Sequence, residues 1–173
     1  VHVDCPGAVN PSQAFEVRME TPSEENKPPT VVVVDDQDDA CYLGPYYWLT
    51  PRIHSAAVWK KGENGSYSVA AGLPGMNATA TYRPDLAAGK YRVSFGESYP
   101  FRPTSQASPP QKLKLTVRHR LGTETVQVAP SASGEIGVFE FTEGNDGFVR
   151  LEAEDAEGTV VADAILFERI ADE

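Results

Sequence analysis

Apolar and polar residues alternate regularly in two stretches of the chain, at residues 90–96 and 112–118. The apolar positions are Tyr91, Val93 and Phe95 in the first stretch and Leu113, Leu115 and Val117 in the second. A period of two places successive side chains on opposite faces of a β-strand. Each stretch therefore predicts a strand with one face in the core and one face in water.

Other short apolar runs, each bounded by Gly, Pro, Asp or Asn, predict the remaining strands. These runs lie at 31–34, 66–70, 78–83, 123–128, 136–141, 148–153 and 159–170. No segment combines a 3.6-residue apolar period with caps at both ends, as a helix would. About nine short strands at intervals of about ten residues predict an all-β fold, and we favour a jelly-roll-type β-sandwich.

Residues 1–30 differ from the rest of the chain. Five prolines and a polar run at 23–27 surround one strand-like stretch at 14–19. We interpret this segment as an arm or linker with at most one strand, followed by a sandwich domain over 31–173. The chain begins at Val1 without an initiator Met or a signal peptide, so we expect a processed part of a larger protein.

Charge and hydropathy exclude two classes of partner. The formal net charge is −10, whereas nucleic-acid contacts need clustered Lys and Arg. No apolar run approaches the roughly 18 residues of a membrane span. We expect a soluble, monomeric module that binds neither nucleic acid nor membrane.

The chain contains two cysteines, Cys5 and Cys41. A disulfide between them would tie the N-terminal arm to the start of the domain, as in many secreted proteins. The alternative is two independent thiols. We predict the disulfide from the expected compartment rather than from geometry.

Four segments resemble one known family. They read VVVDD at 32–36, ATATYRPDLAAGKYRV at 78–93, VRHRLGTETVQV at 117–128 and VVADAILF at 160–167. Together they resemble the golvesin C-terminal domain family, also called the xanthan-lyase-like accessory domain, over about 31–170. The resemblance implies a galactose-binding-like β-sandwich attached to bacterial extracellular enzymes or oxidoreductases, with a sugar-binding role. Residues 40–64 depart from the pattern, because they are longer and more aromatic and include Cys41.

No catalytic arrangement is recognisable. The histidines, His2, His54 and His119, occur in no triad, HExxH or nucleophile-elbow setting. The spacing of the cysteines and histidines fits no zinc site. His119 falls beside Val117 on the apolar side of its strand, which favours a hydrogen-bonded structural histidine. We predict that the module is not an enzyme.

Two groups of residues are candidates for ligand binding. Sugar sites stack aromatic rings on C–H groups and bind hydroxyls with planar polar side chains. The matching loop residues are Tyr46, Tyr47, Trp48, Trp59, Tyr99, Phe101 and Arg102; their alternative role is packing, with Trp48 or Trp59 capping the core. A basic stripe of Lys112, Lys114, Arg118 and Arg120 would suit an acidic polysaccharide. For the stripe we favour the alternative, a solvated strand face paired with acids on a neighbouring strand.

Asp163 is a candidate metal ligand. It lies among apolar residues of the predicted strand 159–170, where a carboxylate needs a partner. In sandwich modules of this general type, a structural Ca²⁺ often lies where the first and last strands meet, and Asp35 and Asp36 would supply oxygens there. The alternative is that Asp163 accepts hydrogen bonds from a turn while residues 35–39 are solvated. The absence of EF-hand spacing favours this alternative.

These observations predict a non-catalytic, carbohydrate-binding accessory module of a larger secreted or cell-surface protein, with bacteria as the expected source. Its partners would be a polysaccharide or a neighbouring catalytic domain. The structural Ca²⁺ is the one candidate cofactor. The alternative function is a structural β-sandwich module that packs against a neighbouring domain or mediates cell-surface assembly, without a free ligand.

Overall fold

The computed structural model describes residues 30–44, 60–61, 67–71, 78–96, 110–129, 134–154 and 156–171. These residues form twelve strands and no helix, and every paired strand is antiparallel to its neighbours. No helix that could cross a membrane therefore occurs in this part of the chain. The predicted all-β class is confirmed.

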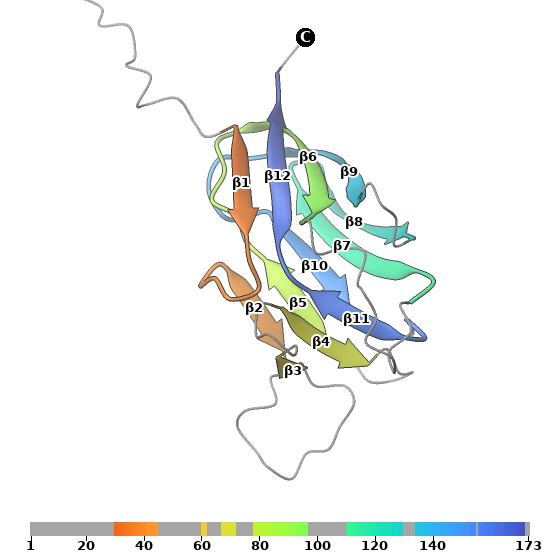
Figure 1. Ribbon diagram of the computed structural model, residues 1–173. Coiled ribbons are helices and arrows are strands. Elements are labelled where there is room, and N and C mark those ends of the chain that lie inside the picture. Colours follow the sequence, from red (N-terminus) through yellow and green to blue (C-terminus); the bar gives the residue numbers. More distant parts are fainter. Residues whose placement is uncertain are drawn as a thin grey trace, which may run out of the picture.

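The strands form three sheets (Figure 1). The first has the order β1 (Val31–Val34), β12 (Ile165–Ile170), β6 (Gly89–Phe95) and β9 (Glu135–Phe141). The second has the order β2 (Cys41–Gly44), β5 (Thr79–Tyr82), β10 (Phe148–Glu152), β7 (Leu113–His119) and β8 (Gly122–Val128). The third has the order β11 (Thr159–Ala162), β4 (Ser68–Ala71) and β3 (Lys60–Lys61).

The first and second sheets enclose one hydrophobic core. Its largest fully buried side chains come from both sheets: Tyr91, Phe141, Phe167, Val93 and Ile165 from the first, and Tyr82, Leu113, Leu115, Val117, Val149 and Leu151 from the second. The chain crosses between these sheets from β5 to β6, from β6 to β7, from β8 to β9 and from β9 to β10. Such repeated crossing is typical of a jelly-roll sandwich, so the predicted architecture is confirmed.

Phe141 lies at the centre of an aromatic cluster within this core. Its ring centroid is 5.8 Å from that of Phe167 and 6.0 Å from that of Tyr91, and both contacts are edge-to-face. Such geometry adds about 0.5–1.5 kcal/mol per pair beyond area burial. Burial also alternates along β6 and β7 as their sequence period predicts.

Two expectations about the strands were wrong. The predicted single strand 159–170 is two strands, because residues 163 and 164 carry the chain from the third sheet into the first. Residues 40–64, in which no strand was predicted, contain β2 and β3. Both strands are short, and β2 owes its conformation to its pairing with β5.

We predict that Leu151→Ala lowers the free energy of unfolding by about 2 to 5 kcal/mol, because it leaves a cavity in a site with 0% exposure. The matched substitution Leu121→Ala, at a side chain that is 79% exposed, should change it by less than about 0.5 kcal/mol. Urea unfolding measures both. Equal losses would show that Leu151 does not lie in the core.

Candidate functional site

The outward side of the second sheet carries a largely polar surface that crosses strands β2, β5, β10 and β7. Because the strand period is two, the residues that alternate with the core positions point outward. On β2, β5 and β10 these residues include Tyr42, Thr79, Thr81, Phe148, Arg150 and Glu152, and on β7 they are Lys114, Thr116 and Arg118. We call this surface, together with Arg83 directly after β5, the outer face.

An exposed tyrosine stands at one edge of the outer face. Tyr42 is 70% exposed, and its ring lies over Gly44, since a Cβ at residue 44 would stand 2.9 Å from Tyr42 Cε1. In the strand register Tyr42 is opposite Thr81, which is opposite Arg150. The Arg150 Nε donates a hydrogen bond to Thr81 Oγ1 at 3.1 Å. An aromatic ring, a hydroxyl and a guanidinium thus follow one another across three strands.

Arginines cover the middle of the outer face. The guanidinium carbons of Arg83 and Arg150 both lie 5.0 Å from the ring centroid of Phe148, within cation–π range. These contacts hold two planar, multidentate donors on one side of the sheet. The outer face as defined has four basic residues, Arg83, Lys114, Arg118 and Arg150, and one acid, Glu152, although the whole chain has a net charge of −10. It is therefore a basic surface on an acidic protein.

Glu152 is fixed within this surface. Its carboxylate accepts a hydrogen bond from Thr116 Oγ1 at 2.7 Å, and Lys114 Nζ stands 2.7 Å from its other oxygen. Burial acts to raise the pKa of Glu152, but the hydrogen bonds from Lys114 and Thr116, with the charges of Lys114 and Arg150, outweigh it and lower this pKa. Part of the predicted basic stripe is therefore paired with an acid on a neighbouring strand, as the favoured alternative holds.

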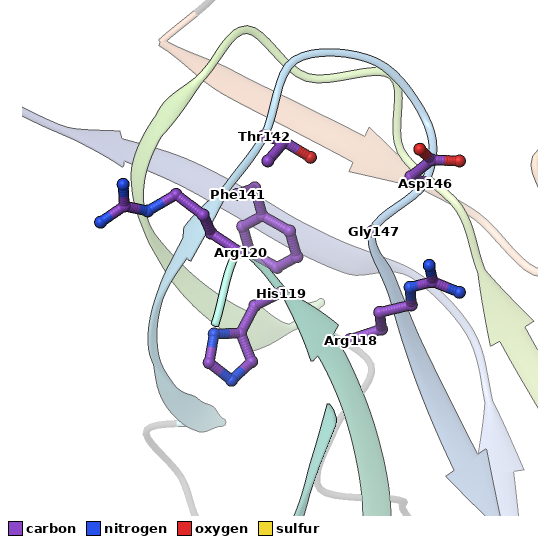
Figure 2. A pocket seen from close by; sticks show the side chains of 7 residues that line it. All are labelled: Arg118, His119, Arg120, Phe141, Thr142, Asp146 and Gly147. Atoms are coloured by element: carbon purple, nitrogen blue, oxygen red, sulfur yellow. The ribbon is translucent and has the colours of Figure 1, made fainter. Parts of the chain in front are cut away.

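A small cavity of about 170 Å³ continues from Arg118 around the end of β7 (Figure 2). It is lined by Arg118, His119, Arg120, Phe141, Thr142, Asp146 and Gly147, and the two arginines lie on either side of the Phe141 ring. This volume is below the roughly 300–1,000 Å³ of typical small-molecule clefts, so it would hold one end of a ligand.

The charged residues of this cavity differ in how they are held. Arg120 Nη2 forms an ion pair with Glu140 at 2.7 Å. His119 packs against Phe139, with ring centroids 5.7 Å apart, and its Nε2 is 3.8 Å from Glu124 Oε1. The Arg118 guanidinium is exposed and has no hydrogen bond or ion pair with any residue that the structure describes. Arg118 is therefore available to a ligand from both the cavity and the outer face.

Three carboxylates meet near the crossing between β11 and β12, where the chain passes from the third sheet to the first (Figure 1). Val34, the last residue of β1, is opposite Ile165, the first residue of β12. This register brings Asp35 and Asp36, which follow β1, close to Asp163 in the crossing. One oxygen of each carboxylate lies within 4.8 Å of the others. We call Asp35, Asp36 and Asp163 the acidic corner.

Asp36 is the buried member of the acidic corner, with 5% exposure. Its Oδ2 accepts hydrogen bonds from Ser68 Oγ and Gln37 Nε2, both at 2.6 Å, whereas its Oδ1 is buried and has no hydrogen-bond partner among the described residues. Burial, together with the charges of Asp35 and Asp163, raises the pKa of Asp36 to about 6, although the two hydrogen bonds oppose this increase. The corner thus concentrates negative charge around a desolvated carboxylate.

Asp35 also shapes the turn after β1. Its Oδ1 accepts a hydrogen bond from the Gln37 backbone N–H at 2.9 Å, and its own backbone N–H donates to Asp38 Oδ2 at 2.8 Å. Residues 35–38 therefore form a turn that is held by hydrogen bonds among these residues, rather than a fully solvated loop. The structure brings the three predicted metal ligands together, and the binding of calcium stays a prediction.

The predicted aromatic ligand site and half of the disulfide lie outside the described residues. This applies to Tyr46, Tyr47, Trp48, Trp59, Tyr99, Phe101 and Arg102, to Cys5, and to the arm at 1–29, so these remain predictions. Cys41 is partly buried against the core, and burial raises the pKa of its thiol to about 12. Tyr42 and Arg150 were not among the predicted site residues, because only the strand register brings them together.

These features define a β-sandwich module. The model of the golvesin C-terminal domain family matches residues 32–169, and the chain belongs to that family. The resemblance in its motifs is thereby confirmed. No curated protein matches the chain at a significant level.

Two solved structures of carbohydrate-active enzymes are similar to this chain. Paenibacillus xanthan lyase shares 21% sequence identity with a TM-score of 0.61, over 82% of this chain and 13% of the lyase chain. A family two carbohydrate esterase from Cellvibrio japonicus shares 10% identity with a TM-score of 0.41, over 81% of this chain and 34% of the esterase chain. The similarity to the lyase shows that the two proteins share a fold. The similarity to the esterase is too weak to support a conclusion. The chain spans only a small part of either enzyme.

We predict that Glu152→Gln destabilises the protein at pH 7 and reduces its loss of stability in acid. Because the pKa of Glu152 is lower in the folded state than in the unfolded state, its ionised carboxylate stabilises the fold. This contribution is complete above the unfolded-state pKa of about 4.3 and is lost as the pH falls through the folded-state pKa. Urea unfolding at pH 7 and pH 3, with Glu168→Gln as the exposed ion-pair control, measures the difference. The same pH dependence in Glu152→Gln as in the wild type would contradict the prediction.

Proposed function

We propose that this chain is a non-catalytic, carbohydrate-binding accessory module of a larger extracellular bacterial protein, and that the outer face is its binding surface. The observation that carries the proposal is the row of Tyr42, Thr81 and Arg150 across β2, β5 and β10. An exposed ring offers a face for pyranose C–H groups, and hydroxyl and guanidinium groups bind sugar hydroxyls. An extended row suits a chain of sugars better than a single one.

The charge of the outer face indicates the class of polysaccharide. Arg118 has no counter-ion in the described part of the chain, and Arg83 and Arg150 are held over Phe148 rather than by carboxylates. Arginine forms bidentate contacts with carboxylates. We therefore propose an acidic polysaccharide, whose carboxylate groups would meet these guanidinium groups. The loop residues Tyr46, Tyr47, Trp48, Trp59, Tyr99 and Arg102 remain further candidates for sugar binding on the evidence of the sequence alone.

A non-catalytic role agrees with the residues present. His119 is held against Phe139, and Asp146 is the one acid that lines the cavity beside it. Family membership also supports an accessory role, and the xanthan lyase is a larger protein of which a domain of this size is one part. By binding a polysaccharide, such a module raises the effective concentration of a linked catalytic domain near its substrate.

A second candidate function is a structural module that packs against a neighbouring domain. The observation that favours it is the outward side of the first sheet, where Val31 and Val33 on the edge strand β1 are 44% and 52% exposed. Such residues on an edge strand are typical of a surface that another domain covers. Failure to bind any polysaccharide would favour this candidate.

We predict that Tyr42→Ala weakens polysaccharide binding by about tenfold or more, equivalent to about 1.4 kcal/mol, because it removes the stacking surface. Tyr42→Phe, which keeps the ring, should bind nearly as the wild type does. Affinity electrophoresis through gels that contain neutral or acidic polysaccharides measures the retardation, with Trp48→Ala and Trp59→Ala tested in the same gels. Free migration of the wild type through every gel would refute the sugar-binding function.

We also predict that Arg118→Ala reduces retardation by acidic polysaccharides more than by neutral ones. Its matched control is Arg92→Ala, since Arg92 is exposed on the first sheet and forms an ion pair with Glu168 at 2.8 Å. Added salt should weaken the acidic interaction further, because exposed charges are screened within about 10 Å at 0.1 M ionic strength. Equal effects of the two substitutions would place the binding surface elsewhere.

A further inference from the structure

We propose that the acidic corner binds one Ca²⁺, and that this ion joins the first sheet to the third. The ligands would be carboxylate oxygens of Asp35, Asp36 and Asp163, completed by water on the open side. This inference does not depend on the proposed function, because the acidic corner and the outer face share no residue.

The first reason is that the described structure leaves three carboxylates together without a counter-charge. One oxygen of each lies within 4.8 Å of the others. The groups that act on Asp36 are two neutral donors, Ser68 and Gln37, and two further carboxylates. Like charges so close repel strongly where water is partly excluded. A cation among them would turn this repulsion into attraction.

The second reason is independent and concerns one atom. Asp36 is 5% exposed, both donors reach its Oδ2, and its Oδ1 is buried without a hydrogen-bond partner among the described residues. A buried carboxylate oxygen without a partner is rare in folded proteins, and a bound ion is one of its recognised explanations. Because Oδ2 is already occupied, Oδ1 is the Asp36 oxygen left for a cation.

The geometry favours Ca²⁺ over Mg²⁺. Calcium–oxygen distances of about 2.3–2.6 Å allow ligand oxygens on opposite sides of the ion to stand up to roughly 5 Å apart. The corresponding span for Mg²⁺, with bonds of about 2.0–2.1 Å, is only about 4 Å, and Mg²⁺ retains most of its water. Oxygens spread over as much as 4.8 Å therefore fit Ca²⁺ without movement of the backbone. Asp35 and Asp163 are only half-buried, which leaves room for water ligands.

The position of the site indicates what the ion would do. Asp35 and Asp36 follow β1 in the first sheet, and Asp163 lies where the chain passes from β11 to β12. The hydrogen bond from Ser68 ties Asp36 to β4 in the third sheet. The ligands come from two distant parts of the sequence, so the unfolded chain lacks the site and binding stabilises the folded state.

The test is thermal unfolding of the full chain after removal of divalent ions with EGTA, followed by titration with Ca²⁺ alone. At about one hundred times the dissociation constant, the wild-type midpoint should rise by about 5 to 10 °C. Mg²⁺ at the same concentration should produce a much smaller rise. Isothermal titration calorimetry should give a stoichiometry of one Ca²⁺ per chain.

Substitutions locate the ion. Asp36→Asn and Asp163→Asn should each abolish most of the Ca²⁺-dependent rise, whereas Asp39→Asn, an exposed residue of the same acidic loop, should retain it. Asp36→Asn also provides a folding control: without Ca²⁺ its midpoint should equal or exceed that of the wild type, because a neutral amide relieves the charge repulsion. Asp35 is a poorer choice, since it also shapes the turn.

Two outcomes would overturn the inference. One is a wild-type midpoint that does not respond to Ca²⁺ through the millimolar range. The other is a response that persists in both Asp36→Asn and Asp163→Asn, which would place the ion elsewhere.

Discussion

The fold depends on the crossing at residues 163 and 164, where the chain leaves the third sheet and enters the first. The Gly96 backbone N–H donates a hydrogen bond to the Ala164 carbonyl at 2.8 Å, which fixes the crossing against the end of β6. A Cβ at residue 96 would stand 3.0 Å from the Ala164 Cβ, so only glycine permits this approach without a shift. From this point β12 runs between β1 and β6, and its residue Phe167 packs against Phe141 in the core. The same crossing places Asp163 beside Asp36. The packing of Phe167 in the core and the assembly of the acidic corner therefore both depend on the path of the chain at residues 163 and 164.

A sandwich leaves each sheet one face that does not take part in the core, and this protein uses its two outward faces differently. On the second sheet, outward residues are threonines, arginines and a tyrosine, held by contacts among themselves such as Arg150 to Thr81 and Thr116 to Glu152. Changes there need not disturb Leu115 or Leu151, which point the other way from the same strands. On the first sheet, Val31 and Val33 leave an apolar edge. One ordered scaffold can thus present a polar binding surface and a packing surface at once.

The sequence predicted what depends on local period and missed what depends on pairing. The strands β6 and β7 were predicted because one face of each is buried, so burial and sequence alternate together. The split between β11 and β12 could not be seen, because VVADAILF is apolar on both sides of Asp163 and reads as one run. Strand β2 was missed because it has only four residues and its outward residue Tyr42 is aromatic, so no alternation of apolar and polar residues is visible in it. The acidic corner was predictable because Asp35 and Asp36 follow the first predicted strand and Asp163 interrupts an apolar run, whereas the outer face requires the register of three strands far apart in sequence.

The two proposed sites have opposite charge, and their separation explains how an acidic chain can present a basic surface. Acids at the corner face one another, with Asp36 almost fully buried, so they cannot pair with the arginines of the outer face. Around Phe148, Arg83 and Arg150 are held by ring contacts, and among the described residues neither forms an ion pair with a carboxylate. A cation at the corner would act on the outer face through the stability of the sandwich, because both sites depend on strands packed against the same core.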